Sequence, residues 1–161
     1  MLNWRKGIFD SNYQVFSEGQ LRFTLNFSAL RNSAIATLQS GIFVFQSNGI
    51  FQSTTTVLDS QHQILATIAF ELTNFKAKIT MKNGEQLDWS FQNSWLKRWT
   101  INNHKEKQIL YNSATGSGTI QSNVDDDILI AMGLFINEYY ARLLFLFILI
   151  CIIVMTISRT H

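Results

Sequence analysis

Apolar and polar residues alternate with a period of two along most of the chain from residue 13 to residue 122. The clearest examples are QLRFTLNF (20–27) and FKAKITMK (75–82). Successive side chains of a strand point to opposite faces, so each segment predicts a strand with one buried and one exposed face. Further strands are predicted at 13–17, 34–38, 42–46, 50–57, 63–71, 86–92, 96–101, 108–112 and 118–122.

Short polar turns separate these strands, and no helix is predicted between them. The Asn-Gly pairs at 48–49 and 83–84 supply the positive φ angles that two-residue hairpin turns require. A meander of short antiparallel strands favours a barrel or a sandwich. We expect a mainly β protein with a closed antiparallel barrel of about 10–12 strands. Such a barrel encloses a wide lumen that must be filled.

The pattern changes completely after residue 124. Asn123 or Asp125 is predicted to cap a helix, with Asp125, Asp126 and Asp127 in the first turn, where the helix dipole favours negative charge. Residues 128–136 are apolar around the whole helix, which indicates burial in protein or in lipid. These nine residues span about 14 Å, too short for a bilayer. We therefore predict that the helix plugs the barrel, through Ile128, Met132, Phe135 and Ile136.

A polar break at Asn137, Glu138 and Arg142 follows the predicted plug, and Glu138 and Arg142 are spaced to pair on one helix face. Residues 143–157 are then apolar up to Ile157, with Thr156 the most polar member. Residues 139–158 would extend about 30 Å as a helix, which matches a hydrocarbon core, with tyrosines in an interfacial belt. The alternative is one long core helix of a soluble protein.

The predicted organisation has three parts: a barrel at 1–124, a plugging helix at 125–142 and a hydrophobic C-terminal membrane anchor at 143–161. The first sixteen residues lack the continuous apolar stretch of a secretory signal, so a single-pass anchor with a cytoplasmic barrel is expected. Arg142 and Arg159 nearly balance across the apolar segment and determine the orientation weakly.

Composition excludes several kinds of chemistry. The net charge is only +2, and the sequence shows no dense basic face of the kind that binds nucleic acid. The single cysteine, Cys151, permits neither a disulfide framework nor a metal-binding pair of cysteines within the chain. Cys151 is expected to be an inert apolar residue of the C-terminal segment, and acylation of its thiol is the alternative. His62 and His104 lie in polar turns without partners at metal-ligand spacing. We expect no catalytic site, no metal and no cofactor.

Basic residues in neighbouring hairpins are the candidate binding site. Lys76, Lys78, Lys82, Lys97 and Arg98 are predicted to meet anionic lipid headgroups, where each cation contributes about 1 kcal/mol. The alternative is a solvated outer face whose lysines discourage edge-to-edge aggregation.

Three tryptophans, Trp89, Trp95 and Trp99, lie close together in the sequence. Core packing is the default expectation for them. A lipid or ligand groove, or a position at the membrane interface, is the alternative.

The hairpins VLDSQHQIL and ITMKNGEQL, followed by the acidic-capped apolar helix DDDILIAMGLF, resemble the tubby C-terminal-like superfamily, which includes tubby-like proteins, phospholipid scramblases and LURP-one-related proteins. The resemblance covers roughly residues 13–140 and implies a closed barrel of about twelve strands around a buried C-terminal helix. Tubby-like members bind phosphoinositides and scramblases are linked to calcium, but neither motif is present here. Residues 125–127 also lack the spacing of an EF-hand loop.

The leading hypothesis is a non-catalytic, membrane-anchored barrel that binds membrane lipid and no nucleic acid, with protein partners unknown. A soluble barrel with a small apolar ligand in its lumen is the alternative. An enzyme would require His62 or His104 in a pocket beside a carboxylate.

Overall fold

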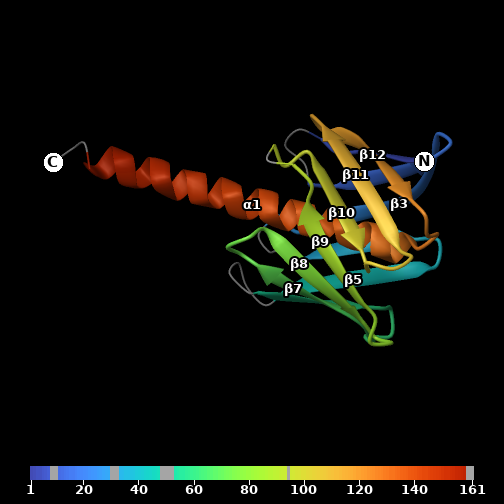
Figure 1. Cartoon of the computed structure of the whole chain (residues 1–161). Helices are drawn as coiled ribbons and strands as arrows, with labels where there is room; N and C mark the ends of the chain where they lie inside the picture. The colour runs from blue at the N-terminus through green and yellow to red at the C-terminus, as the bar shows by residue number, and fades with distance from the viewer. Residues whose placement is uncertain (8–10, 30–32, 48–52, 94, 159–161) are drawn as a thin grey trace.

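The computed structural model describes residues 1–7, 11–29, 33–47, 53–93 and 95–158, which form twelve strands and one long helix (Figure 1). The strands are β1 (Leu2–Arg5), β2 (Tyr13–Ser17), β3 (Gln20–Phe27), β4 (Ala34–Leu38), β5 (Gly41–Ser47), β6 (Thr54–Leu58), β7 (Ile64–Glu71), β8 (Lys76–Met81), β9 (Gln86–Phe91), β10 (Arg98–Asn102), β11 (Gln108–Ala114) and β12 (Ser117–Ser122). The helix is α1 (Asp127–Ser158).

The strands form a closed antiparallel barrel in which each strand pairs with its neighbours in the sequence. β1 closes the ring, because Leu2 lies opposite Ile120 of β12 on one side and opposite Ser17 of β2 on the other. The predicted fold class is therefore confirmed. The sequence pattern missed β1, a strand of only four residues, although Leu2 and Trp4 alternate with Asn3 and Arg5.

Strand boundaries differ from the predictions where turns intervene. β6 begins at Thr54, and positions 48–52, which include the predicted turn at 48–49, lie outside the described residues. β10 begins at Arg98 rather than at Leu96, because Leu96 adopts a left-handed φ of 56°. Gly84 has a φ of 84°, which supplies the positive φ expected for the hairpin turn between β8 and β9.

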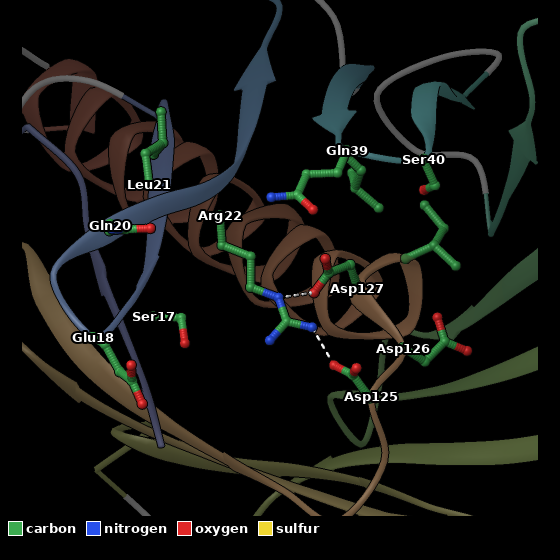
Figure 2. A pocket seen from close by; sticks show the side chains of 12 residues that line it. Ser17, Glu18, Gln20, Leu21, Arg22, Gln39, Ser40, Asp125, Asp126 and Asp127 are labelled. Carbon is green, nitrogen blue, oxygen red and sulfur yellow. Dashed lines mark hydrogen bonds and ion pairs between the residues drawn. The ribbon is translucent and has the colours of Figure 1, made fainter.

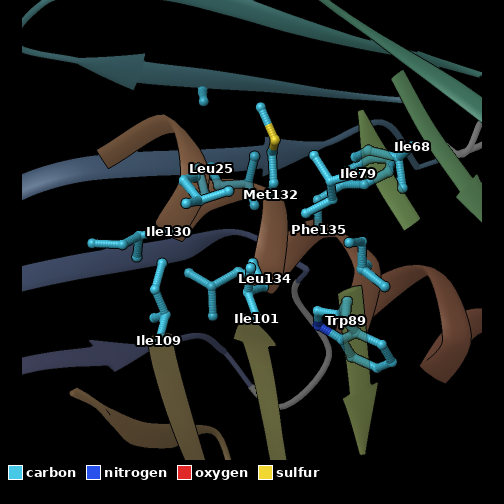
Figure 3. Packing of buried hydrophobic residues seen from close by; sticks show 14 of the residues in the cluster. Leu25, Ile68, Ile79, Trp89, Ile101, Ile109, Ile130, Met132, Leu134 and Phe135 are labelled. Atoms are coloured by element: carbon cyan, nitrogen blue, oxygen red, sulfur yellow. The ribbon is translucent and has the colours of Figure 1, made fainter. Parts of the chain in front are cut away.

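The inward faces of the strands and one part of α1 build a single core (Figure 3). Eight consecutive helical residues, 129–136, are buried. A helix can be buried on every side only if protein surrounds it, so this part of α1 fills the lumen. Phe135 stacks on Phe27 and Phe45, with ring centroids 5.3 and 4.7 Å apart.

Three of the four predicted plug residues, Met132, Phe135 and Ile136, are completely buried. Ile128 is only partly buried, because it lies one turn earlier, where the helix enters the barrel. Burial of each large apolar side chain contributes about 1.5–3 kcal/mol, so the plug is a major source of stability for the barrel.

Tyr139 and Tyr140 correct another expectation, since they were predicted to lie in an interfacial belt and are instead buried inside the barrel. The ring of Tyr139 stacks on Phe70, and that of Tyr140 stacks on Trp89. Beyond them the strands no longer cover the helix: Phe145 is 70% exposed and Phe147 is 65% exposed.

At Gly133, α1 lies in close contact with the barrel wall. A Cβ atom at this position would lie 2.2 Å from Oη of Tyr111. Tyr111 is held in place, because its ring stacks on Trp99 at 5.3 Å and its hydroxyl donates a hydrogen bond to the carbonyl of Ile130. The tyrosine hydroxyl therefore requires a glycine at this point of the helix.

Replacing Gly133 by alanine is expected to lower the free energy of unfolding by about 2–3 kcal/mol, because the added methyl group overpacks the core. On an unconstrained helix the same change stabilises by about 1 kcal/mol, so the sign is diagnostic. Chemical denaturation in detergent, followed by tryptophan fluorescence, measures the effect. The Tyr111→Phe background removes the nearest atom and should reduce the loss; an unchanged or raised stability of Gly133→Ala contradicts the packing described here.

Candidate functional site

The two mouths of the barrel are chemically different. We call the end where α1 leaves the barrel the exit mouth. The connection between β7 and β8 lies there, since the hydroxyl of Tyr140 donates to the carbonyls of Glu71 and Lys76. Alternate connections of an antiparallel meander share one mouth, so the connections before β2, β4, β8 and β10 belong to the exit mouth. The opposite end is the far mouth.

A buried carboxylate holds α1 at the exit mouth. Glu138 is 4% exposed and accepts hydrogen bonds from Lys6 Nζ at 2.6 Å and from the hydroxyls of Ser11 at 2.7 Å and Tyr13 at 2.8 Å. Arg142 Nε lies 3.4 Å from the other side of the carboxylate, which confirms the predicted pairing. The remaining three partners come from the N-terminal segment, more than 120 residues away, and the sequence pattern did not indicate them.

These contacts determine the ionisation of the group. Burial by itself raises the pKa of Glu138. The charge and the hydrogen bond of Lys6, together with the hydrogen bonds from the hydroxyls of Ser11 and Tyr13, outweigh this effect and hold the pKa below its usual range. Burial and the nearby carboxylate raise the pKa of Tyr13 well above its usual value. Glu138 is therefore an acceptor and Tyr13 a donor at neutral pH. Arg142 extends the cluster by donating to the carbonyl of Ser28 at 2.9 Å.

The structure separates the five predicted headgroup-binding residues. Lys76 begins β8, and Arg98 begins β10 directly after Lys97, so these three lie at the exit mouth. Strands β8 and β10 both flank β9, which places the backbones of Lys76 and Arg98 about 10 Å apart. We call Lys76, Lys97 and Arg98 the basic rim; all three are exposed.

The other two predicted residues lie elsewhere. Lys78 is exposed in the middle of β8, opposite Asp88 on β9. Lys82 follows the end of β8 at the far mouth, where its ammonium group donates to Gln63 at 3.1 Å. A strand of six residues extends about 20 Å, so Lys82 is at the opposite end of the barrel from Lys76.

Large apolar residues accompany the basic rim. Trp95 is 81% exposed in the connection between β9 and β10, and Leu72 is 38% exposed in the connection between β7 and β8. Trp89 and Trp99 are buried as predicted, whereas the expectation of core packing is wrong for Trp95. Its neighbour Leu96 adopts a left-handed conformation, with a φ of 56°.

An apolar groove lies between the β7–β8 connection and the emerging helix. Its volume is about 390 Å³. We call it the rim groove; it is lined by Leu72, Phe75, Leu143, Leu144, Leu146, Phe147 and Ile150. Phe75 has a left-handed φ of 51°, a conformation that bulky residues rarely adopt. Because its lining residues come from both the β7–β8 connection and α1, the rim groove joins the edge of the barrel to the apolar surface of the helix.

The far mouth carries a polar pocket of about 750 Å³ beside the first turn of α1 (Figure 2). Arg22 of β3 forms ion pairs with Asp125 and Asp127, and these tie the start of the helix to the barrel wall. The hydrogen bond that Arg22 donates to Asp125 raises the pKa of Arg22. Burial raises the pKa of Asp127 and outweighs the opposite effect of Arg22. The single positive charge of Arg22 is therefore paired with two carboxylates of this pocket.

The residue that caps α1 is neither of the two predicted. Asp126 is the cap, because its Oδ1 accepts the backbone N–H of Leu129 at 3.0 Å. Asn123 instead bonds the backbone of Gln108 and Glu106, and Asp125 is engaged by Arg22. The spacing of these acidic residues alone did not distinguish the alternatives.

The remaining polar candidates lie on the surface. His104 Nε2 is 2.9 Å from Asp88 Oδ2, but both side chains are exposed to solvent, by 72% and 47%. Among the described residues, no group of three His, Cys, Asp or Glu side chains is arranged to hold a metal ion. Cys151 is a free thiol on the part of α1 outside the barrel.

Comparison of the chain with models of protein families, with curated protein sequences and with solved structures finds no match. The structure by itself shows a closed twelve-stranded barrel with one long apolar helix through it. By length and composition that helix can cross a membrane, and the barrel buries none of its most hydropathic 18-residue stretch.

Proposed function

We propose that the chain is a single-pass membrane protein whose plugged barrel is non-catalytic and binds anionic lipid headgroups through the basic rim. The observation that carries the proposal is the change of environment along α1: residues 129–136 are enclosed by strands, and the apolar residues 143–157 are not. Exposed runs of this size are typical of segments covered by lipid.

The basic rim supports the lipid-binding part of the proposal. Lys76, Lys97 and Arg98 lie at the mouth from which the apolar helix leaves, so a bilayer around that helix brings its headgroups next to them. Anionic lipids are concentrated in the cytoplasmic leaflet. The basic residues on the barrel side of the helix therefore favour a cytoplasmic barrel.

Two related considerations bear on the proposal. The first is a relationship to the tubby C-terminal-like superfamily, which we also propose. Such a relationship implies a barrel of about twelve strands around a C-terminal helix, and the barrel described here supports it. The alternative function, transport of a small apolar ligand in the lumen, requires the space that residues 129–136 occupy. The geometry therefore favours the anchored barrel.

Replacing the three basic-rim residues by glutamine is expected to abolish the preference for anionic lipid. Each cation contributes about 1 kcal/mol near an anionic surface, so the preference falls by up to about 100-fold in the triple variant. The measurement is electron paramagnetic resonance of full-length protein in vesicles, with spin-labelled phosphatidylserine compared with spin-labelled phosphatidylcholine as the motionally restricted lipid.

A charge-matched control removes three cations from the far mouth, namely Lys82 and the two lysines of the connection between β10 and β11: Lys82→Gln, Lys105→Gln and Lys107→Gln. These residues lie about 20 Å from the exit mouth, beyond the screening length of physiological salt. The control is expected to keep the preference for phosphatidylserine. Equal losses in the two triple variants would show that total charge, and not the basic rim, attracts the lipid.

A further inference from the structure

The apolar surface of α1 begins almost directly where the barrel ends. Tyr140 is the last fully buried residue of the helix, and the apolar run starts three residues later, at Leu143. Three helical residues extend about 4.5 Å. Arg142, which lies between them, donates a hydrogen bond to the carbonyl of Ser28 on the barrel. A bilayer that covers the helix from Leu143 onward therefore brings the exit mouth to the edge of the hydrocarbon.

The junction between barrel and helix is also stiff. α1 is continuous from Asp127 to Ser158, and the sequence contains no proline that would kink it. Arg142 fixes the helix at the mouth, because it contacts the carbonyl of Ser28 and the ring of Phe27 on the barrel. Figure 1 shows the helix leaving the barrel as one uninterrupted rod. The barrel consequently cannot swing away from the membrane surface on a flexible linker.

The exit mouth carries residues typical of a membrane interface. Trp95 and Leu72 protrude from exit-mouth connections, next to Lys76, Lys97 and Arg98. Tryptophan beside lysine or arginine is typical of the membrane–water interface. The far-mouth turns at 18–19, 39–40 and 83–84 consist of polar residues and glycine, although Leu21, Ile42 and Ile64 are exposed at the far-mouth ends of β3, β5 and β7. The exit mouth is therefore the end at which an exposed tryptophan, basic residues and the apolar surface of α1 meet.

Resting on the membrane anchoring proposed above, we propose that the exit mouth is seated in the lipid surface of one leaflet, with Trp95 in the interface and a lipid acyl chain in the rim groove. The groove is continuous with the helix surface that faces lipid, since five of its seven lining residues lie between Leu143 and Ile150. Leu72 and Phe75 form its other wall and place the β7–β8 connection at the same depth.

Fluorescence quenching by brominated lipid tests the seating. Full-length protein is reconstituted in phosphatidylcholine vesicles brominated either near the glycerol end or near the methyl end of the acyl chains. The emission of Trp95 is the difference between wild type and Trp95→Phe, because the other three tryptophans are buried. Most of this emission is expected to be lost with shallow bromines, less with deep bromines, and little with acrylamide added to the water.

Two relocated tryptophans complete the experiment. Trp95→Phe with Leu72→Trp places the reporter in the rim groove, where brominated acyl chains are expected to quench it. Trp95→Phe with Gln61→Trp places it in an exposed far-mouth turn, where acrylamide quenches and bromine does not. Quenching at position 61 by bromine, or its absence at position 72, overturns the proposal.

Carbonate extraction of the same samples separates the two proposals. If the protein resists extraction but acrylamide quenches Trp95 and bromine does not, the seating is wrong and the anchor stands. If carbonate releases the protein, the anchor itself is wrong. If Trp95 is shielded from both quenchers, a protein surface such as a second copy of this chain covers the rim, and the lipid seating is overturned.

Discussion

Full-length protein with Ile148→Arg, Leu149→Arg and Ile152→Arg is expected to lose its membrane association completely. Twelve of the fifteen residues from 143 to 157 are Leu, Ile, Phe or Val, which together favour insertion by about 5 kcal/mol. Each arginine near the middle of a spanning helix opposes insertion by about 3 kcal/mol, so three of them outweigh the whole apolar run. Carbonate extraction followed by flotation measures the effect.

The matched control exchanges apolar residues at the same positions: Ile148→Leu, Leu149→Ile and Ile152→Leu. It preserves the hydropathy of the run and is expected to float with the membrane as wild type does. Near-ultraviolet circular dichroism should be the same for the arginine variant and wild type, since the three side chains are exposed outside the barrel. Retention of the arginine variant after carbonate treatment would mean that residues 143–157 do not anchor the chain.

Glu138→Gln is expected to produce the largest loss of barrel stability, about 3 kcal/mol at neutral pH, because it removes one partner of a buried ion pair. Lys6 and Arg142 then face an uncharged amide at the exit mouth. The free energy of unfolding in detergent, from chemical denaturation, measures the loss. Glu85→Gln is the control: Glu85 pairs with Lys107 near the surface, and its loss should amount to about 0.5 kcal/mol.

The pH dependence has a definite sign. The pKa of Glu138 is lower in the folded protein than in the unfolded chain, where it is about 4.3. Its stabilisation is therefore fully present above the unfolded pKa and is lost as the pH falls through the folded pKa. The difference in stability between wild type and Glu138→Gln should be constant above about pH 5 and should shrink in more acidic solution. A difference that grows on acidification contradicts this assignment.

Local patterns in the sequence predicted most of the architecture. The period of two in segments such as 20–27 and 75–82 indicated strands, because alternation reflects which side of a barrel wall each residue faces. The predicted plug was correct at Met132, Phe135 and Ile136, because a helix with no polar face requires burial on all sides. The i, i+4 spacing of Glu138 and Arg142 likewise predicted their contact.

The sequence by itself thus determined the barrel, the helix inside it and the change of environment along that helix, since each follows from the order of apolar and polar residues. Only the tertiary structure decided which distant side chains meet. It joined Lys6 to Glu138, placed Trp95 outside while Trp89 is inside, and moved Lys82 to the opposite end of the barrel from Lys76. Periodicity specifies the face on which a residue lies, whereas its neighbours depend on strand register and barrel closure, which form only when all twelve strands pair.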